Sequence, residues 1–207
     1  MHEVLIEQKA RVKLPTRFGE FVMHGFSSLS DGSEPVELAK GDVEGKENVL
    51  RRIHSECLTG DVFGSRRCDC GQQLARALEA IEEKGEGVLL YLRQEGRGIG
   101  LLNKLHAYEL QKQGLDTLDA NLHLGFEADE RDYFAAAQIL RFLGVKSNEL
   151  MTNDPDKVSR LELYGTQVTN RVPVEIEACS HDRRYLQTKQ TRMGHLLHVT
   201  EETGKNA

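Results

Sequence analysis

The spacing of apolar residues changes near position 70, and this change limits the possible folds more than any other feature of the sequence. Before that point apolar and charged residues alternate, as they do around Val12 and Leu14, and this period of two is typical of half-buried strands. After it, apolar residues such as Leu74 and Leu78 recur at helical spacing. We therefore expect a strand-rich part over about 1–70, followed by a part that contains helices.

The strand-rich part holds further short strands between turn-forming residues. Breaks fall at Pro15, at 30–32 and at 44–45, and they separate the segments GEFVMHGF, PVELAKGDV and NVLRRIH. Short strands joined by polar turns are typical of antiparallel sheets and barrels. We expect an antiparallel, barrel-like arrangement for these strands.

The second part, about 71–198, alternates helices with strands. The expected elements are helices over about 74–85, 101–114 and 129–143, a buried strand at 88–92, a strand near 149–151 and a helix that begins at Asp154-Pro155. This alternation predicts a mixed α/β fold with crossover connections. No linker clearly divides the chain, so we expect a single domain over 1–207 with a flexible tail at about 199–207. His195 and His198 are expected on the surface near that tail.

Charge and hydropathy argue against several classes of protein. Lys and Arg number 27 against 33 Asp and Glu, a net charge of −6, whereas proteins that bind nucleic acids broadly carry a basic excess. No stretch approaches the roughly 20 apolar residues that a membrane span needs. The first residues mix acids and bases, unlike a signal peptide. We expect a cytoplasmic protein that binds neither nucleic acid nor membrane.

Three of the four cysteines are crowded into the pattern Cys57-x10-Cys68-x-Cys70, and this crowding favours a metal site over disulfides. Three thiolates suit zinc and leave one tetrahedral position open, as in catalytic sites. A fourth ligand, for which His54 and Cys179 are candidates, would make the site structural. Free, buried cysteines are the remaining alternative.

A glycine-rich segment, RQEGRGIG at 93–100, follows the strand expected at 88–92 and precedes a helix. Glycines let backbone amides approach an anion, and Arg97 could bind a phosphate group through two hydrogen bonds. The spacing is neither the dinucleotide fingerprint nor a P-loop. The alternative is an ordinary strand-to-helix turn with a solvated arginine.

Three further features permit both a structural and a functional interpretation. The acids at 129–132 could cap the helix that they are expected to open, or could hold Arg131 toward a substrate. The segment TNDPDK at 152–157 could cap the next helix, or could bind a ligand at the end of a strand. Tyr108, on an apolar helix face, could belong to the core or take part in catalysis.

Taken together, these stretches resemble GTP cyclohydrolase II, which commits GTP to riboflavin synthesis. The matching segments are RRIHSECLTGDVFGSRRCDCG, YLRQEGRGIGLLNKLHAYELQKQGLDTLDANLHLGFEADERDY, MTNDPDKV and YLQTKQTRMGHLL. The resemblance covers essentially the whole chain in the order of the family. It implies zinc-dependent hydrolysis of GTP to formate, diphosphate and 2,5-diamino-6-(5-phosphoribosylamino)pyrimidin-4-one, the first step of riboflavin biosynthesis.

The resemblance implies distinct groups for the two cleavages. One zinc ion per subunit, on Cys57, Cys68 and Cys70, would activate water for attack at C8, with Tyr108 handling protons. For the phosphates, the family pattern makes Asp129 the proton acceptor and Arg131 the nucleophile at the α-phosphorus. An arginine is a poor nucleophile, so charge stabilisation by Arg131 remains the alternative. Mg2+ would neutralise the substrate phosphates.

The resemblance also marks residues for binding GTP. These are Arg52, Ile53, His54, Ser55, Glu56, Gln73, Glu95, Gly96, Arg97, Thr117, Thr152 and Lys157. By residue type, Glu95 suits the donor edge of guanine, and the basic residues suit the triphosphate. Asp154 stands where the family usually has Asn and would weaken phosphate binding by about 1 kcal/mol; Arg67 stands where it often has Leu.

The resemblance further implies a homodimer. Two alternatives remain for the activity. One is a paralogue that opens the ring but stops at an earlier product, and the other is a non-catalytic zinc or nucleotide-binding module.

Overall fold

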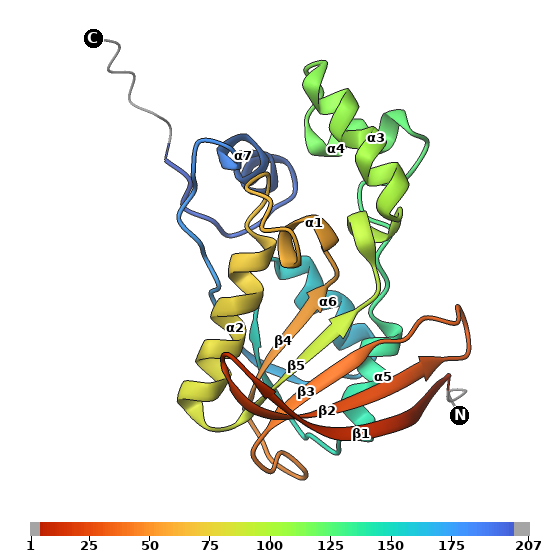
Figure 1. Ribbon diagram of the computed structural model, residues 1–207, viewed down its shortest axis with the longest axis vertical. Helices are drawn as coiled ribbons and strands as arrows, with labels where there is room; N and C mark the ends of the chain where they lie inside the picture. The colour runs from red at the N-terminus through yellow and green to blue at the C-terminus, as the bar shows by residue number, and fades with distance from the viewer. Residues whose placement is uncertain (1–4, 201–207) are drawn as a thin grey trace.

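The structure is a computed structural model that describes residues 5–200, and it is built around one mixed sheet with the strand order β1-β2-β3-β5-β4-β6-β7 (Figure 1). The strands are β1 (Ile6–Thr16), β2 (Gly19–Ser28), β3 (Val36–Lys40), β4 (Val49–Ser55), β5 (Gly87–Leu92), β6 (Asn148–Met151) and β7 (Val168–Val172). The helices are α1 (Leu58–Asp61), α2 (Cys70–Lys84), α3 (Leu101–Lys112), α4 (Thr117–His123), α5 (Phe134–Phe142), α6 (Pro155–Leu163) and α7 (Arg183–Arg192), with a 3-10 turn η1 at Glu95–Gly98. The expected mixed α/β class is confirmed.

The first three strands are antiparallel, as expected from their alternating sequence. β1 and β2 form a long hairpin, and β3 pairs antiparallel with β5. β3 pairs with β2 on one side and with β5 on the other, so the three strands continue into the main sheet. They do not close into the barrel-like arrangement that was expected. The predicted break at Pro15 is slightly early, since Pro15 still pairs with Glu20 and the strand ends at Thr16.

β4 is the strand whose direction the sequence did not indicate. We expected it within the antiparallel part, yet it pairs in parallel with both β5 and β6. The reason is the crossover through α1 and α2, which returns the chain to the edge at which β4 began. The two central strands therefore end at the same edge of the sheet.

Two apolar layers fix the sheet between helices. On one face Leu78 and Ile81 of α2 pack in a cluster with Leu50 and Leu89. On the other face, α5 and α6 supply a second cluster that includes Ile53 of β4. At roughly 25 cal/mol per Å2 of apolar area buried, these layers are the main source of stability for the sheet that carries the site.

Several boundaries differ from those expected. The third predicted helix begins at Phe134 instead of Asp129. The preceding residues are held in a turn instead, because the Arg131 N–H donates to the Asp129 carboxylate and the Glu130 N–H donates to the Arg97 carbonyl oxygen. The helix predicted from Asp154-Pro155 is confirmed, with Asp154 accepting from the Asp156 N–H. α4 and α7 were not expected. The predicted tail lies outside the described residues from position 201 onward, and none of the described helices is long and apolar enough to cross a membrane.

The carboxyl ends of β4, β5 and β6 place three loops next to one another. Parallel strands end at a shared edge, where α/β proteins commonly bind ligands. The segments that leave this edge are 56–57, 93–100 and 152–154. α3, α4 and α7 surround the same edge in Figure 1, and they enclose the cavity described next.

Candidate active site

The three clustered cysteines meet at one end of a cavity. Cys57 precedes α1, Cys70 is the first residue of α2, and all three sulfurs lie within 4.8 Å of one another. The Cys57 and Cys68 sulfurs are 3.7 Å apart, close to the separation of about 3.8 Å that two zinc–sulfur bonds of about 2.3 Å make at a tetrahedral angle. A Cβ on Gly60 would lie 3.1 Å from the Cys68 sulfur, so glycine leaves room for the thiolates. The donor set therefore fits zinc.

Neither residue considered as a fourth ligand joins this group. His54 stacks on Tyr91, and its Nε2 lies 3.0 Å from an oxygen of Asp61. The Cys179 sulfur lies 3.9 Å from the carbonyl oxygen of Arg66. Within residues 5–200, the cluster of His, Cys, Asp and Glu that could hold a metal consists of the three cysteines alone. Three protein ligands, with no fourth among the described residues, match the catalytic interpretation, in which one coordination position would be left for water.

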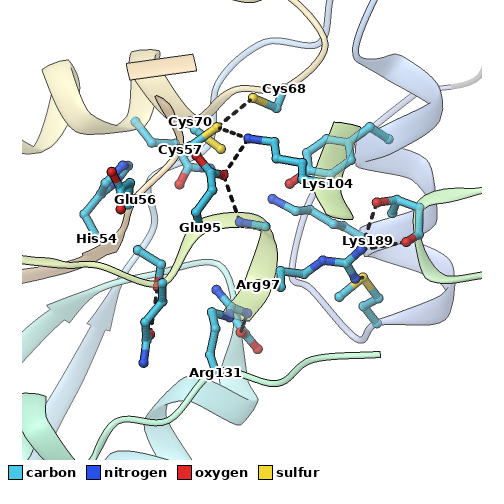
Figure 2. A pocket seen from close by; sticks show the side chains of 18 of the residues that line it. His54, Glu56, Cys57, Cys68, Cys70, Glu95, Arg97, Lys104, Arg131 and Lys189 are labelled. Carbon is cyan, nitrogen blue, oxygen red and sulfur yellow. Dashed lines mark hydrogen bonds and ion pairs between the residues drawn. The ribbon is translucent and has the colours of Figure 1, made fainter. Parts of the chain in front are cut away.

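Lys104, which the sequence analysis did not select, lies against the cluster. Its ammonium donates to the Cys57 sulfur at 3.1 Å and to Glu95 at 2.7 Å (Figure 2). Burial by itself would lower the pKa of Lys104, but the hydrogen bond to Glu95 and the Cys57 thiolate outweigh burial and raise it. Hydrogen bonds from the Cys68 and Cys70 thiols, followed by the charge of Lys104, hold the pKa of Cys57 well below its usual range. Cys57 is thus prepared as a thiolate.

Tyr108 lies one helical turn from Lys104 and faces the same end of the cavity. Its hydroxyl is 3.3 Å from Thr59 Oγ1, which in turn is 3.6 Å from the Cys57 sulfur. Burial raises the pKa of the Tyr108 phenol, so it keeps its proton at neutral pH. Arg67 lies over the ring, with its guanidinium carbon 4.7 Å from the ring centroid. Tyr108 is therefore placed to donate a proton near the sulfur cluster.

Glu95 makes three hydrogen bonds within the chain. Its carboxylate accepts from the Leu58 N–H at 2.6 Å, from the Gly96 N–H at 2.8 Å and from Lys104. Few lone pairs are left for a guanine edge, which is the role suggested by its residue type. The geometry assigns Glu95 to holding the glycine-rich loop against α1.

Arg97 is also occupied. Its guanidinium donates to the carbonyl oxygens of Ala128 at 2.8 Å and Thr117 at 2.6 Å. Gly96 and Arg97 both have positive φ angles, 64° and 62°, which turn the loop sharply. The loop lines the cavity, but these contacts tie the Arg97 side chain to the wall instead of leaving it free for a phosphate group.

Asp129 and Arg131 form an ion pair at the opposite end. The Arg131 Nε–H donates to both carboxylate oxygens of Asp129, at 2.8 and 3.1 Å, and Nη2 donates to one of them. Asp154 lies 3.7 Å from Nη2. Burial opposes both charges, yet the pairing lowers the pKa of Asp129, and the neighbouring Tyr133, Asp129 and Asp154 raise that of Arg131. The proton therefore stays on Arg131.

Two further cations lie deep in the same cavity. Arg52 donates to the Met151 carbonyl oxygen at 2.9 Å and to Gln73 at 2.6 Å, while its Nε has no partner. Lys157 donates to the Ile53 carbonyl oxygen at 3.0 Å. Burial, and then the charges of Arg52 and Arg131, lower the pKa of Lys157. Burying cations so close together favours an anion as their ligand.

The cavity unites most of the residues selected from the sequence. Of the residues marked for GTP binding, all but Ile53 line it, as do the three cysteines, Tyr108 and Arg131. The Ile53 side chain is fully buried in the core, and Asp129 reaches the cavity only through Arg131. His198 is exposed as expected, whereas His195 lines the cavity, so its expected surface position is wrong.

Several lining residues were missed. Lys104 could have been found from its spacing of four residues to Tyr108, which places both on one helix face. Tyr185, Lys189 and His195 come from α7 and the residues after it, and their place depends on long-range docking that has no local sequence pattern.

Comparison with known proteins decides the family. The family model for GTP cyclohydrolase II matches residues 7–173. The chain belongs to the GTP cyclohydrolase II family. It is 57% identical over 195 residues to the riboflavin biosynthesis protein RibBA of Bacillus subtilis, covering 94% of this chain and 49% of that protein. It is 55% identical to RibBA of Bacillus cereus, covering 96% of this chain and 50% of the relative.

The chain thus spans about half the length of the curated relatives that it matches. A crystal structure of RibBX, described as a two-domain 3,4-dihydroxy-2-butanone 4-phosphate synthase from A. baumannii, aligns with 82% of this chain and 41% of its own. At 18% identity and a TM-score of 0.47, that alignment is too weak to support an inference about this chain.

Proposed function

We propose that this chain is a GTP cyclohydrolase II that hydrolyses GTP, with opening of the imidazole ring at C8 and release of formate and diphosphate. The product would be 2,5-diamino-6-(5-phosphoribosylamino)pyrimidin-4-one. One observation carries the proposal: a single cavity joins the three-sulfur cluster and Tyr108 at one end to Arg131 and Lys157 at the other. A nucleotide with its base at the first end and its phosphates at the second would place both reacting centres beside the residues that suit them.

At the ring end, Cys57, Cys68 and Cys70 would hold zinc. Bound there, zinc would act as a Lewis acid that makes water nucleophilic near neutral pH. Tyr108 would supply the proton that the opening ring nitrogen needs, because its phenol remains protonated and lies near the cluster. Glu56 lines the cavity and contacts Arg93 at 3.3 Å, so it is a freer acceptor for the guanine edge than Glu95.

At the phosphate end, Arg131 would act as a charge-stabilising cation. Nucleophilic attack by Arg131 needs Asp129 to remove a proton, but their ion pair holds that proton on the guanidinium. Asp154, where the family usually has Asn, strengthens the same preference from 3.7 Å. A fixed cation beside the transferring phosphoryl group stabilises the charge that develops there. Mg2+, held mainly by substrate oxygens, would share that charge.

The test is mass spectrometry of the nucleotide product after zinc-loaded protein is incubated with GTP and Mg2+, with formate and diphosphate counted. One formate and one diphosphate per GTP, with the diaminopyrimidine monophosphate, are expected. A product that retains the formyl group or the triphosphate would identify a paralogue that stops early. If folded, zinc-bound protein leaves GTP unchanged, the protein is a non-catalytic zinc or nucleotide-binding module.

The cysteines offer a matched pair of variants for this test. Cys57→Ser should lose zinc and product formation while the protein stays folded. Cys179→Ser removes a thiol outside the cluster and should keep both. Equal loss in the two variants would contradict the assignment of the metal site.

Three expectations from the family resemblance stand as proposals with this function. They are one zinc ion per subunit, assembly as a homodimer, and a cytoplasmic location. Metal analysis and size-exclusion chromatography with light scattering test the first two, and fractionation of cells that express the protein tests the third.

A further inference from the structure

The C-terminal helix supplies one wall of the cavity, although it lies beyond the residues 7–173 that the family model matches. Tyr185 and Lys189 of α7, and His195 after it, line the cavity. We propose that Lys189 is a substrate-binding residue that holds a phosphate group of the nucleotide. The inference rests on the proposed function for the identity of the nucleotide.

The Lys189 ammonium is largely enclosed, and its ion pair with Asp69 is long. Its side chain is 14% exposed, and the nearest carboxylate oxygen, on Asp69, is 3.7 Å from Nζ. That distance is well beyond the 2.7–2.9 Å of a charge-assisted hydrogen bond. It also contacts Tyr185, whose ring centroid is 4.4 Å from Nζ and whose side chain hydrogen-bonds to the ammonium. The Asp69 oxygen that faces Lys189 accepts no hydrogen bond and is paired with the ammonium only at this longer distance, so the ammonium, which has three N–H donors, has donors left for a ligand.

The position of Lys189 suits a nucleotide that spans the cavity. In Figure 2 it lies between Lys104, which contacts Cys57, and Arg97, with Arg131 beyond. A substrate whose base approaches the sulfurs and whose phosphates approach Arg131 would pass Lys189 on the way. The site therefore favours a phosphate near the ribose over the guanine base, because a lysine acts as a point charge for phosphate.

The helix is fixed where it can present Lys189 to the cavity. On one side Arg192 pairs with Asp119 at 2.7 Å and also with Asp116. On the other side the Leu196 N–H donates to the Asn153 carbonyl oxygen at 2.8 Å, beside the end of β6. These contacts connect α7 to both walls, so Lys189 is held in place before any ligand binds.

The experiment compares zinc-loaded wild type with Lys189→Met, Lys189→Arg and Arg184→Met. Arg184→Met removes a positive charge from the same helix outside the lining of this cavity, and it is the matched control. Calorimetry measures the affinity for inorganic triphosphate and for guanosine, which separate the phosphate and base ends of the substrate. Steady-state kinetics with GTP give KM and kcat, and metal analysis with thermal melting checks the site and the fold.

Lys189→Met should weaken triphosphate binding by about tenfold, the loss of one charge-assisted hydrogen bond, and should raise KM for GTP by a similar factor. In Lys189→Met, the affinity for guanosine and the zinc content should stay within twofold of wild type. Arg184→Met should match wild type in every measurement. Lys189→Arg should retain most of the affinity for triphosphate. Unchanged triphosphate binding, an equal loss for triphosphate and guanosine, or a loss of zinc would each overturn the proposal. A wild type that binds triphosphate but leaves GTP unchanged would refute the proposed function and leave the assignment of Lys189 to be decided by the triphosphate titration.

Discussion

Replacing Arg97 with Met distinguishes two possible roles of this side chain in the glycine-rich loop, one structural and one in phosphate binding. The resemblance marks Arg97 for binding GTP, whereas its guanidinium donates to the carbonyl oxygens of Ala128 and Thr117 and to Thr117 Oγ1, at 2.6–2.9 Å. If these contacts are its main role, Arg97→Met will lower the stability of the fold. If it binds phosphate, the variant will fold normally and bind triphosphate poorly.

The magnitude follows from the groups that Arg97→Met leaves unpaired. Each buried carbonyl that loses its donor costs about 1–3 kcal/mol. Two carbonyls are affected, at Ala128 and Thr117, and partial rehydration reduces the sum, so we expect a loss of about 3 kcal/mol. For a chain of this size, 1 kcal/mol corresponds to about 2–4 °C in Tm, which gives a decrease of about 6–12 °C.

The assay is thermal melting of zinc-loaded protein followed by circular dichroism, paired with calorimetric titration of inorganic triphosphate. Arg93→Met is the control, because the Arg93 side chain is 54% exposed and its ion pair with Glu56 spans 3.3 Å, and ion pairs of exposed side chains contribute less than about 1 kcal/mol. An Arg97→Met protein that melts within 2 °C of wild type but binds triphosphate tenfold more weakly would refute the structural interpretation.

Three further predictions concern the two ends of the cavity. Tyr108→Phe should slow formate release by about 100-fold or more with unchanged zinc content, because a general acid is removed; unaltered formate release would remove Tyr108 from proton transfer. Asp154→Asn should tighten GTP binding by about fivefold, since it removes a carboxylate 3.7 Å from Arg131 while Asn still caps α6; weaker binding in a titration would contradict this. Burial, and then the charge of Lys189, lowers the pKa of His195 to about 4. As the pH falls from 6.5 to 4, His195 is therefore protonated in the unfolded chain but stays neutral in the folded chain. Relative to His195→Gln, wild type should lose about 3 kcal/mol of unfolding free energy over that interval, and parallel curves in urea titrations would disprove the burial of His195.

Features with local causes could be predicted from the sequence. The cysteine spacing predicted the sulfur cluster because two ligands lie on one turn and the third is a short loop away. The Asp154-Pro155 pair predicted the start of α6 because a side-chain cap and a fixed φ act within one turn. The acids near 129 did not mark the start of α5, because Asp129 accepts a hydrogen bond from the Arg131 N–H in a turn that precedes the helix.

Features that depend on long-range packing could not be predicted. The direction of β4 depends on which edge of the sheet accepts β5 after the crossover, and the alternation of β4 alone cannot show this. Lys189 lies in a strongly polar helix whose docking depends on ion pairs such as Arg192 with Asp119, about 70 residues apart in sequence. Arg97 was expected to bind phosphate because of its residue type, and its hydrogen bonds to the distant carbonyl oxygens of Ala128 and Thr117 have no local pattern that would predict them.

The glycine-rich loop makes the two ends of the cavity depend on each other. At one end Glu95 binds the Leu58 N–H and Lys104 beside the sulfur cluster. Two residues on, the Arg97 carbonyl accepts from the Glu130 N–H at 3.0 Å, between Asp129 and Arg131. A Cβ on Gly98 would lie 2.9 Å from the Glu130 backbone, so the loop fits against that segment only with glycine there. Four residues therefore set the distance between the proposed ring-opening and phosphate-cleaving groups, and a nucleotide held in one pose can meet both.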